Sequence, residues 1–335
     1  MTMEAKRSRP TLQDIADRVG ITKMTVSRYM RNPDSVAQAT RDKIAQVVEE
    51  LGYIHNRTPA MLSKSSSKAI GILLPSLSNQ VFSSFAQGVE HVTNLNGYDT
   101  LIAHYSYDRD VEEKKIESFL SYQVDGLILT DTNHTERTLQ MIKTAGIPVV
   151  EAMDLPVNPI DMAVGLDHMQ AAYEVVTQMI AKGKRNIAYF GARLDTRTQL
   201  RMHGYDKAVT EAGLEPLHVL TKEHSSFALG STLLDKALLI QPELDGVFCT
   251  NDDIAIGTIM ACRAKQQRVP EDISVVGFNA LDMGKVISPT LASIDTPRFE
   301  IGKKSAELLL AALSGAPSEQ KVFDMGFTIT EGESL

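Results

Sequence analysis

The chain of 335 residues contains no tryptophan, only two cysteines and few aromatic residues, which make up 6% of it. So few aromatic side chains argue against a stacking surface for single-stranded nucleic acid. No run of about 18 apolar residues occurs, and the first nine residues are polar and charged, so we expect neither a membrane span nor a signal peptide. We therefore predict a bacterial cytoplasmic protein with no membrane partner.

Sequence signatures of enzymes are missing as well. The first strand-like segment, "GILLP", is followed by "SLSNQVF", without the glycine-rich turn of a dinucleotide fold. There is no G-x-S-x-G nucleophile turn and no His or Cys cluster with zinc spacing. We interpret His104, His134 and His203 as polar surface or cleft residues, and Cys249 and Cys262 as buried reduced thiols. These absences predict no catalytic activity, no cofactor and no metal.

The composition that remains is 43% hydrophobic and 23% charged, which is typical of a globular protein, and the length suggests two or three compact units. The charge is unevenly divided. Residues 1–64 hold 11 Lys and Arg against 7 Asp and Glu, whereas the remainder holds 23 against 35. A basic end on an acidic body predicts a polyanionic partner for the basic end alone.

The basic end has the signals of a helix-turn-helix. Thr11 can accept a hydrogen bond from the backbone near Asp14, and apolar residues recur at helical spacing up to Gly20, which tolerates the positive φ of a helix end. Thr22 can cap a second helix that runs to about residue 30, and a third helix from about residue 37 ends before Gly52. Two short helices joined by a glycine turn and closed by a third predict this motif, whose second helix lies in the major groove of DNA.

The second helix carries polar and basic residues on its outward face. Lys23 and Arg28 can donate hydrogen bonds to the O6 and N7 atoms of guanine, and Met24 offers an apolar contact to a thymine methyl group or a cytosine edge. Thr25 and Ser27 can bind phosphates. The alternative interpretation is the solvated face of an ordinary three-helix bundle.

From Lys68 onward, apolar runs alternate with amphipathic helices, such as those over 82–95, 111–122 and 169–182. The strand-like runs are "AIGILLP", "DTLIAHY", "VDGLILT", "IPVVEA", "NIAYFGA", "DGVFCT" and "ISVVGF". This alternation predicts parallel sheets covered by helices on both faces. Two successive sets, 68–165 and 166–294, and a tail that crosses back to the first set predict a two-lobed core.

Polar residues follow several of these runs, at the edge of a parallel sheet where ligands bind. The candidate ligand contacts are Asn79, Phe82, Arg193, Arg197, Arg201, Asn251 and Asn279. Asp252 lies among them in sequence, but we expect it to cap the helix "DIAIGTIMAC" rather than to contact a ligand.

The segment "TLQDIADRVGITKMTVSRYMRNPDSVAQATRDKIAQVVEELGYIHNR" resembles the DNA-binding headpiece of the lactose-repressor (LacI/GalR) family, including its "TVSR" and "LGY". The resemblance continues through almost the whole chain. It is strongest to the gluconate- and idonate-utilisation repressors, with shared words such as "TKMTVSR", "LLPSLSNQVF" and "LDGVFCTNDD".

The resemblance implies an α+α/β architecture. Residues 1–54 would form the helix-turn-helix headpiece and residues 55–67 the linker with its hinge helix. Residues 68–335 would form a bilobed core like the periplasmic binding proteins, which binds the effector and dimerises. Its N-subdomain would span about 68–165 and 296–326, and its C-subdomain about 166–294 and 327–335.

The resemblance also implies which residues contact double-stranded operator DNA. The family's main base-contacting positions are occupied by Lys23, Met24 and Arg28. Positions near the phosphate backbone are occupied by Thr11, Thr22, Thr25, Ser27 and Asn32.

In the linker, Leu62 matches a leucine that the family inserts into the minor groove, and Asn56 and Arg57 match contacts that precede it. His55 and Pro59 depart from the family's usual proline and alanine, which leaves the start of the hinge helix open. The alternative for this segment is a plain tether.

In the cleft, Arg201 matches the arginine that clamps the sugar in the family, and Asn251 and Asn279 match hydroxyl-binding positions. Many relatives have aspartate at the position of Asn279. An amide in its place, together with Arg197, predicts a more cationic cleft and hence a sugar-acid effector such as gluconate. The alternative is that the arginines form salt bridges between the lobes and that the effector is neutral or phosphorylated.

These features predict a repressor that binds a palindromic operator as a homodimer, since one headpiece makes too few contacts. Helices near 82–95 and in "DDIAIGTIMACRA" are the expected subunit contacts, and burial in a monomer core is the alternative for both. The segment "GFTITEGESL" contains no leucine heptads, so a tetramer is not expected. A solute-binding receptor is the alternative from another class, but it has no use for residues 1–64.

Overall fold

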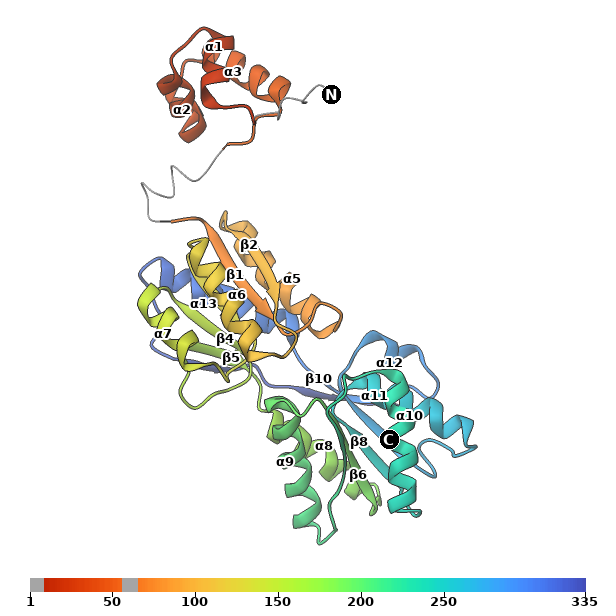
Figure 1. Ribbon diagram of the computed structural model, residues 1–335. Coiled ribbons are helices and arrows are strands. Elements are labelled where there is room, and N and C mark those ends of the chain that lie inside the picture. The colour runs from red at the N-terminus through yellow and green to blue at the C-terminus, as the bar shows by residue number, and fades with distance from the viewer. Residues whose placement is uncertain (1–8, 56–65) are drawn as a thin grey trace, which may run out of the picture. The chain divides into compact units, whose positions relative to one another are not determined.

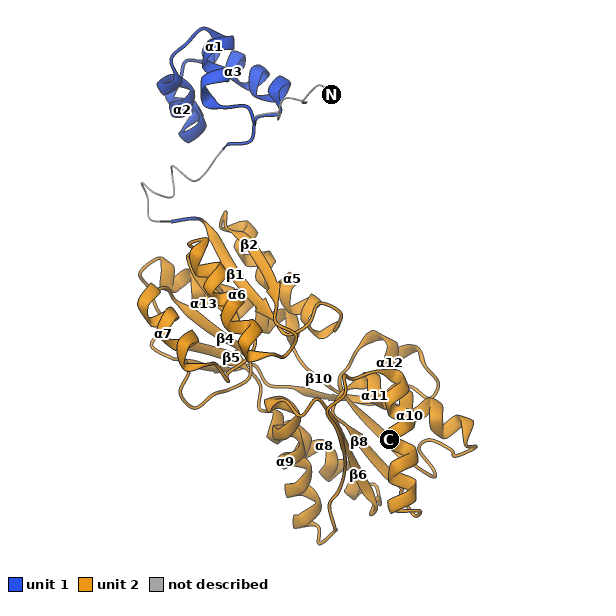
Figure 2. Cartoon of the chain, in the orientation of Figure 1, with its two compact units in different colours: residues 1–67 blue, residues 68–335 orange. Residues whose placement is uncertain are grey.

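The computed structural model describes residues 9–55 and 66–335. The chain forms two compact units, residues 1–67 and residues 68–335 (Figure 2). Within the described ranges, no helix combines the length and the apolar character needed to cross a membrane.

The first unit contains α1 (Leu12–Val19), α2 (Lys23–Arg31), a short 3₁₀ helix (Pro33–Ser35) and α3 (Gln38–Leu51). The Thr11 hydroxyl accepts the Asp14 backbone N–H, and the Asp14 carboxylate accepts the Thr11 backbone N–H at 2.7 Å, so α1 begins with a complete capping box. Gly20 ends α1 at a φ of 76°, and Thr22 caps α2, as the sequence predicted.

The three helices of this unit surround one small apolar core. Its buried members are Ile15, Ala16, Val26, Val36 and Ile44, contributed by all three helices and the connection before α3. A helix-turn-helix closed by a third helix is therefore the fold of this unit, and the exposed side of α2 is left free of core contacts.

The second unit is built on two six-stranded sheets, which define its first and second lobes. The first sheet has the strand order β11-β5-β4-β3-β1-β2 and the second has the order β12-β10-β9-β8-β6-β7. All neighbouring strands run parallel except β12, which is antiparallel to β10.

The elements of the first lobe are β1 (Ala69–Leu74), α5 (Val81–Leu95), β2 (Asp99–His104), α6 (Arg109–Ser121), β3 (Gly126–Leu129), α7 (Glu136–Ala145), β4 (Val149–Met153), β5 (Met162–Gly165), α13 (Arg298–Leu313) and β11 (Val322–Asp324). Helices α5 and α13 lie side by side on one face of the sheet, and α6 and α7 cover the other (Figure 1).

The elements of the second lobe are α8 (His168–Ala181), β6 (Ile187–Ala192), α9 (Thr196–Glu211), β7 (Leu217–Thr221), α10 (Phe227–Ile240), β8 (Gly246–Cys249), α11 (Asp252–Ala264), β9 (Ser274–Asn279), α12 (Asp282–Val286), β10 (Ala292–Asp295) and β12 (Thr328–Thr330). Helices α8 and α9 pack together on one face, and α10 and α11 pack together on the other. Cys249 and Cys262 are buried free thiols, as the sequence predicted.

The return of the chain to the first lobe depends on two glycines. A Cβ atom at Gly88 of α5 would lie 2.1 Å from the carbonyl oxygen of Phe299, and one at Gly302 of α13 would lie 2.1 Å from that of Phe85. Because neither contact is sterically possible, α5 and α13 can pack this closely only with glycine at both positions.

Candidate functional site

The exposed face of α2 is the first candidate site. Lys23, Met24 and Arg28 are exposed, and Met24 keeps 71% of its surface accessible, although it is a large apolar side chain. Thr25 and Ser27 are half-buried beside them. Val26 is the residue of α2 that enters the core. Two cations, two hydroxyls and a flexible apolar side chain thus share one surface, which suits contacts to base edges and phosphates.

Three of the residues predicted to contact the phosphate backbone of DNA lie at helix ends, and their side chains already form hydrogen bonds with neighbouring residues. The Thr11 hydroxyl lies 2.7 Å from a carboxylate oxygen of Asp14, and the Thr22 hydroxyl lies 3.0 Å from the hydroxyl of Thr25. The Asn32 side-chain oxygen accepts the backbone N–H of residue 34 at 3.2 Å. These residues therefore fix the helix ends whether or not DNA is bound. Asn56, Arg57, Leu62 and the predicted hinge helix lie outside the described residues.

The second candidate site is the cleft between the two lobes of the core. All seven ligand contacts predicted from the sequence gather around one void of about 40 Å³, namely Asn79, Phe82, Arg193, Arg197, Arg201, Asn251 and Asn279. They come from the segments that follow β1, β6 and β8, and from the last residue of β9. The seven residues therefore lie together at the carboxyl ends of parallel strands, and their contact with a ligand stays a prediction.

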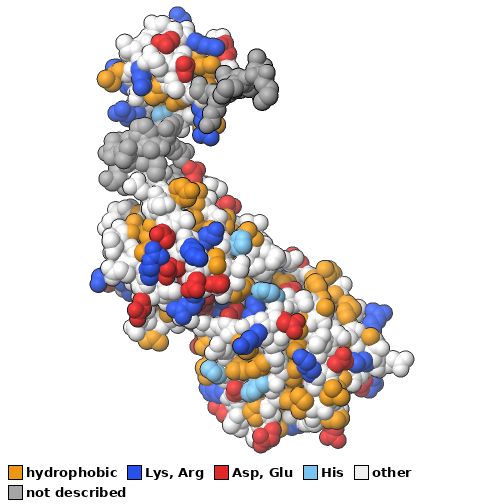
Figure 3. Space-filling model, in the orientation of Figure 1, with side chains coloured by type: hydrophobic (Ala, Val, Ile, Leu, Met, Phe, Trp, Pro, Cys, Tyr) orange, Lys and Arg blue, Asp and Glu red, His pale blue; other side chains and the backbone are white. Residues whose placement is uncertain are grey.

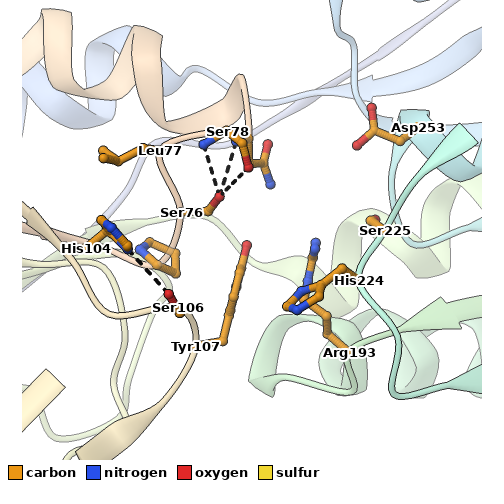
Figure 4. Close-up of a pocket in the computed structure, with 12 residues that line it drawn as sticks. Ser76, Leu77, Ser78, His104, Ser106, Tyr107, Arg193, His224, Ser225 and Asp253 are labelled. Carbon is orange, nitrogen blue, oxygen red and sulfur yellow. Dashed lines mark hydrogen bonds between the residues drawn. The ribbon is translucent and has the colours of Figure 1, made fainter. Parts of the chain in front are cut away.

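A larger cavity of about 470 Å³ adjoins this void and shares Asn79, Tyr107 and Arg193 with it (Figure 4). Its volume is within the range of small-molecule sites. Its polar lining is made by Ser76, Ser78, Asn79, His104, Ser106, Tyr107, Arg193, His224, Ser225 and Asp253. Hydroxyls, imidazoles and an amide around one cavity suit a ligand with many hydroxyl groups.

Arg197 connects the two lobes. Its guanidinium donates to the backbone oxygen of Thr130 at 3.1 Å and lies 3.5 Å from the carboxylate of Asp154. Burial alone would raise the pKa of Asp154, but the positive charge of Arg197 and the neighbouring His168 hold that pKa below its ordinary value. The pair is therefore charged and buried, with one member in each lobe.

Arg201 is held by a neutral histidine. The Nε2 atom of His168 lies 2.9 Å from the carbonyl oxygen of Met153, and its Nδ1 atom lies 3.3 Å from the Nε atom of Arg201. Burial and the nearby Arg201 charge lower the pKa of His168, which favours the neutral tautomer with its proton on Nε2. Arg201 also donates to the Thr250 carbonyl and lies 3.6 Å above the Phe278 ring, and burial lowers its pKa to about 10.

The expectation that Asp252 caps α11 is wrong. Asn251 is the N-cap, because it has the extended backbone conformation of that position and its side-chain oxygen accepts the Ile254 N–H at 3.3 Å. Asp252 is buried one residue later, where its carboxylate accepts the Leu281 N–H and the Ser293 hydroxyl, each at 2.6 Å. Burial raises the pKa of Asp252 to about 7. This side chain therefore holds α11 against β10 and the segment after β9.

The interpretation of His134 as a surface or cleft residue is also wrong. Its Nδ1 atom lies 3.0 Å from the Glu112 carboxylate and its Nε2 atom lies 3.6 Å from that of Glu151, and all three side chains are buried in the first lobe. Glu151 in turn accepts the Ile160 backbone N–H at 2.6 Å. A lone histidine in the sequence gave no sign of partners 22 and 17 positions away. No group of His, Cys, Asp and Glu in the described ranges is arranged to hold a metal ion.

Sequence reasoning missed several cleft residues. Tyr107 and Asp154 follow β2 and β4, so the strand-end rule would have found them if it had been applied to every strand. His168 follows β5, a strand that the sequence analysis did not identify, and it reaches Arg201 through the packing of α8 on α9.

A helix-turn-helix unit in one chain with a two-lobed α/β core that encloses a polar cleft defines a class of ligand-responsive transcriptional regulators. Residues 11–56 match the bacterial regulatory proteins of the lacI family. Residues 67–324 match the periplasmic binding proteins and sugar binding domain of the LacI family. The chain belongs to this family and is a DNA-binding transcriptional regulator, not an enzyme.

The similarity extends over nearly the full length of individual relatives. The chain is 50% identical over 330 residues to the HTH-type transcriptional regulator GntR of Escherichia coli K12, which covers 98% of this chain and 100% of that protein. It is 45% identical over 331 residues to the regulator IdnR of the same strain, with 98% and 100% covered. A LacI-family regulator from Silicibacter pomeroyi is 29% identical, with a TM-score of 0.91 over 97% of this chain and 99% of that one.

Proposed function

We propose that the protein is a repressor of sugar-acid catabolism genes that binds a palindromic operator as a homodimer and is released from it by an effector of the gluconate type. One observation carries this proposal: a helix-turn-helix with an exposed Lys23-Met24-Arg28 face occurs in the same chain as a polar cleft with three arginines. Such a regulator acts on chromosomal DNA, so we place it at the nucleoid in the bacterial cytoplasm.

For DNA, the proposed base contacts are Lys23, Met24 and Arg28. The proposed phosphate contacts are Thr11, Thr22, Thr25, Ser27 and Asn32. Asn56, Arg57 and Leu62 would complete the interface from the linker. Thr11 and Thr22, at the starts of α1 and α2, are well suited to phosphates, because the backbone N–H groups at a helix start favour an anion. We assign this reading function to residues 1–54, the joint to 55–67 and the sensing function to 68–335.

For the homodimer, the second lobe offers an apolar patch formed by Phe227, Met260, Met283 and Val286. All four are exposed, Val286 to 77%, and the first three line a groove of about 550 Å³ between α10, α11 and α12. Hydrophobic side chains gather near α12 on the face seen in the space-filling view (Figure 3). An exposed apolar patch of this kind favours a protein contact, and a symmetric dimer would cover it on both subunits.

A second surface in the first lobe supports the same arrangement. Strand β2 is the edge strand of its sheet, and Leu101 and Ile102 of this strand are exposed. Leu95, at the end of the neighbouring helix α5, is also exposed. Helices α5 and α11 are those for which the sequence predicted subunit contacts.

For the effector, the chemistry of the cleft supports a polyhydroxylated anion. The small void has three arginines and one aspartate, Asp195, in its lining. Asp195 caps α9 by accepting the Thr198 N–H at 2.8 Å. The lining therefore keeps an excess of positive charge. Relatives that carry the names GntR and IdnR are consistent with an effector of the gluconate class.

Effector binding would change how the lobes close on each other and thereby separate the paired headpieces. To shift operator occupancy from 99:1 to 1:99 requires about 5.5 kcal/mol of differential binding. In a dimer two effector sites share this requirement, so each needs to contribute only about half of it.

The decisive experiment selects an operator from random duplex DNA and measures binding by gel shift with and without gluconate. Calorimetry then compares gluconate, idonate, 6-phosphogluconate, sorbitol and glucose. We expect a palindromic site, release by gluconate and no response to glucose. Tightest binding to a neutral sugar would overturn the sugar-acid effector, and failure to bind any duplex at low salt would overturn the repressor itself.

A further inference from the structure

The three arginines of the cleft differ in what their guanidinium groups already contact. Arg197 has a carboxylate partner in Asp154 and a backbone acceptor in Thr130. A ligand carboxylate could bind Arg197 only in competition with Asp154, at the cost of leaving that buried acid unpaired. Arg197 is therefore suited to joining the lobes and poorly suited to recognising an anion.

Arg201 is engaged as well. Three of its hydrogen-bond contacts go to His168 and the Thr250 carbonyl, and one face of its guanidinium is covered by Phe278. It borders the void of about 40 Å³ and does not line the cavity of about 470 Å³. A six-carbon ligand in the larger cavity could reach Arg201 with a hydroxyl at one end, while most of the ligand lies elsewhere.

Arg193 differs in both respects. Its Nε atom is buried and has no hydrogen-bond acceptor within the described part of the chain. Among the described residues that line the larger cavity, it is the one with a permanent positive charge. A buried guanidinium N–H without an acceptor costs free energy, which a bound anion would recover.

The position of Arg193 is fixed by the backbone and by the opposite lobe. Arg193 and Leu194 both have positive φ values, 64° and 58°, in the turn between β6 and α9. The Arg193 backbone N–H donates to the Glu223 carbonyl at 3.2 Å. Across the cleft, its guanidinium carbon lies 4.7 Å from the ring centre of Tyr107 in the first lobe. Figure 4 shows the two side chains next to each other at the cavity, with His224 beside Arg193.

A single carboxylate, Asp253, stands in the lining of the same cavity. No ion pair within 4 Å joins Asp253 to Arg193 in the described residues. Burial raises the pKa of Asp253, and the charge of Arg193 offsets only part of that rise. An aspartate that faces a cavity can accept hydrogen bonds from hydroxyl groups, as can the Ser76 and Ser78 hydroxyls nearby. The cavity thus has a cationic side and a hydroxyl-accepting side.

We propose that Arg193 is the residue that recognises the carboxylate of the effector, and that the hydroxyl groups of the effector extend toward Asp253 and the Ser76–Ser78 turn. This inference rests on the proposed sugar-acid effector and adds the identity of the anion-binding side chain. The two arginines then have different roles: Arg193 binds the negative charge of the effector, and Arg197 joins the lobes.

The test compares gluconate with gluconamide, which has the same hydroxyl groups and a neutral amide in place of the carboxylate. Calorimetry measures both ligands on the full-length wild-type protein, Arg193→Gln and Arg193→Lys. Lys236→Gln, which removes an exposed cation of the second lobe outside the cleft, is the matched control. Because hydrogen bonds to a charged group contribute about 1.5–3 kcal/mol, the wild type should prefer gluconate about 10- to 100-fold.

In Arg193→Gln the preference should fall to within about threefold, with the loss confined to gluconate. Arg193→Lys should keep an intermediate preference, because it retains the charge without the planar fork, and Lys236→Gln should behave as the wild type. A full preference in Arg193→Gln, or an equal loss for both ligands, overturns the assignment while the gluconate response of the wild type keeps the proposed function intact. A wild type that binds operator but neither ligand overturns the sugar-acid effector and this inference together.

Discussion

The guanidinium of Arg197 lies 3.5 Å from the carboxylate of Asp154, and the two side chains belong to different lobes of the core. Asp154 follows β4 of the first sheet, whereas Arg197 is in α9 beside the second sheet. Both are buried, and Asp154 also lies 3.3 Å from His168. A buried charged pair in this position contributes to the stability of the fold and holds the two lobes together at the cleft.

Asp154→Asn should lower the free energy of unfolding by about 3–5 kcal/mol, because it leaves the Arg197 charge buried without a counter-ion. Urea denaturation followed by circular dichroism measures the change. The double variant Asp154→Leu/Arg197→Met should lose much less, since neither charge is then left alone. If the single and double variants lose the same stability, the two side chains do not act as a pair.

Stability should also fall at alkaline pH because of His134. Burial alone would lower the pKa of His134, but the hydrogen bond to Glu112 and the nearby Glu151 carboxylate raise it from 6.5 to about 9. The folded protein therefore favours the protonated imidazole. The stabilisation is complete below pH 6.5, where the unfolded chain is protonated too, and is lost as the pH rises through about 9.

His134→Gln tests this dependence. The urea midpoint of the wild type should decrease between pH 6.5 and about 9.5, and the variant should be less stable at pH 6.5 and show a flatter profile over that interval. His203→Gln, at an exposed histidine, is the control and should follow the wild type. Parallel profiles for wild type and His134→Gln would contradict the role of the buried imidazole.

Met24→Ala should change which operators are bound without changing stability. Because Met24 is 71% exposed, the free energy of unfolding should stay within about 0.5 kcal/mol of the wild type. Loss of its apolar contact should weaken discrimination at one base pair of each half-site by about 1–3 kcal/mol. Competition gel shifts with single-base operator variants measure this. Lys43→Ala, at an exposed position of α3, should leave base preference unaltered.

Met260→Asp should separate the subunits of the proposed homodimer. It places a charge in the apolar patch on α11, which would have to be desolvated when two copies meet. Sedimentation equilibrium should show a clear shift from dimer to monomer, together with weaker operator binding. Leu239→Asp, at an apolar residue of α10 that is 84% exposed and outside the patch, is the matched control. A dimer that tolerates Met260→Asp would place the subunit contact on another surface.

Much of the architecture could be predicted from the sequence, because the helix caps and the apolar strand runs agreed with the order of helices and strands along the chain. The caps at Thr11 and Thr22, the stop at Gly20 and the seven apolar strand runs all appear in the structure. The strands that the sequence analysis did not identify are β5, β7, β10, β11 and β12. These are short or lie toward the sheet edges, so their apolar signal is weak, and β11 and β12 have three residues each.

The candidate cleft could be predicted as a set of positions but not as a set of contacts. Strand ends identify Arg193, Arg197 and Arg201 equally, and nothing in their spacing shows that Arg197 has a carboxylate partner 43 residues away. Asn251 and Asp252 were likewise indistinguishable as caps, since both residue types favour that position and backbone conformation decides between them.

The chain passes between the two sheets three times, after β5, after β10 and after β11. Each lobe is therefore assembled from separated pieces of polypeptide, and the first obtains α13 and β11 only after the second is almost complete. A nonsense codon shortly after position 296 would strip both lobes of an edge strand at once. Truncating the chain from its C-terminus will therefore disrupt both lobes together. To produce one lobe alone will require circular permutation or the joining of distant fragments.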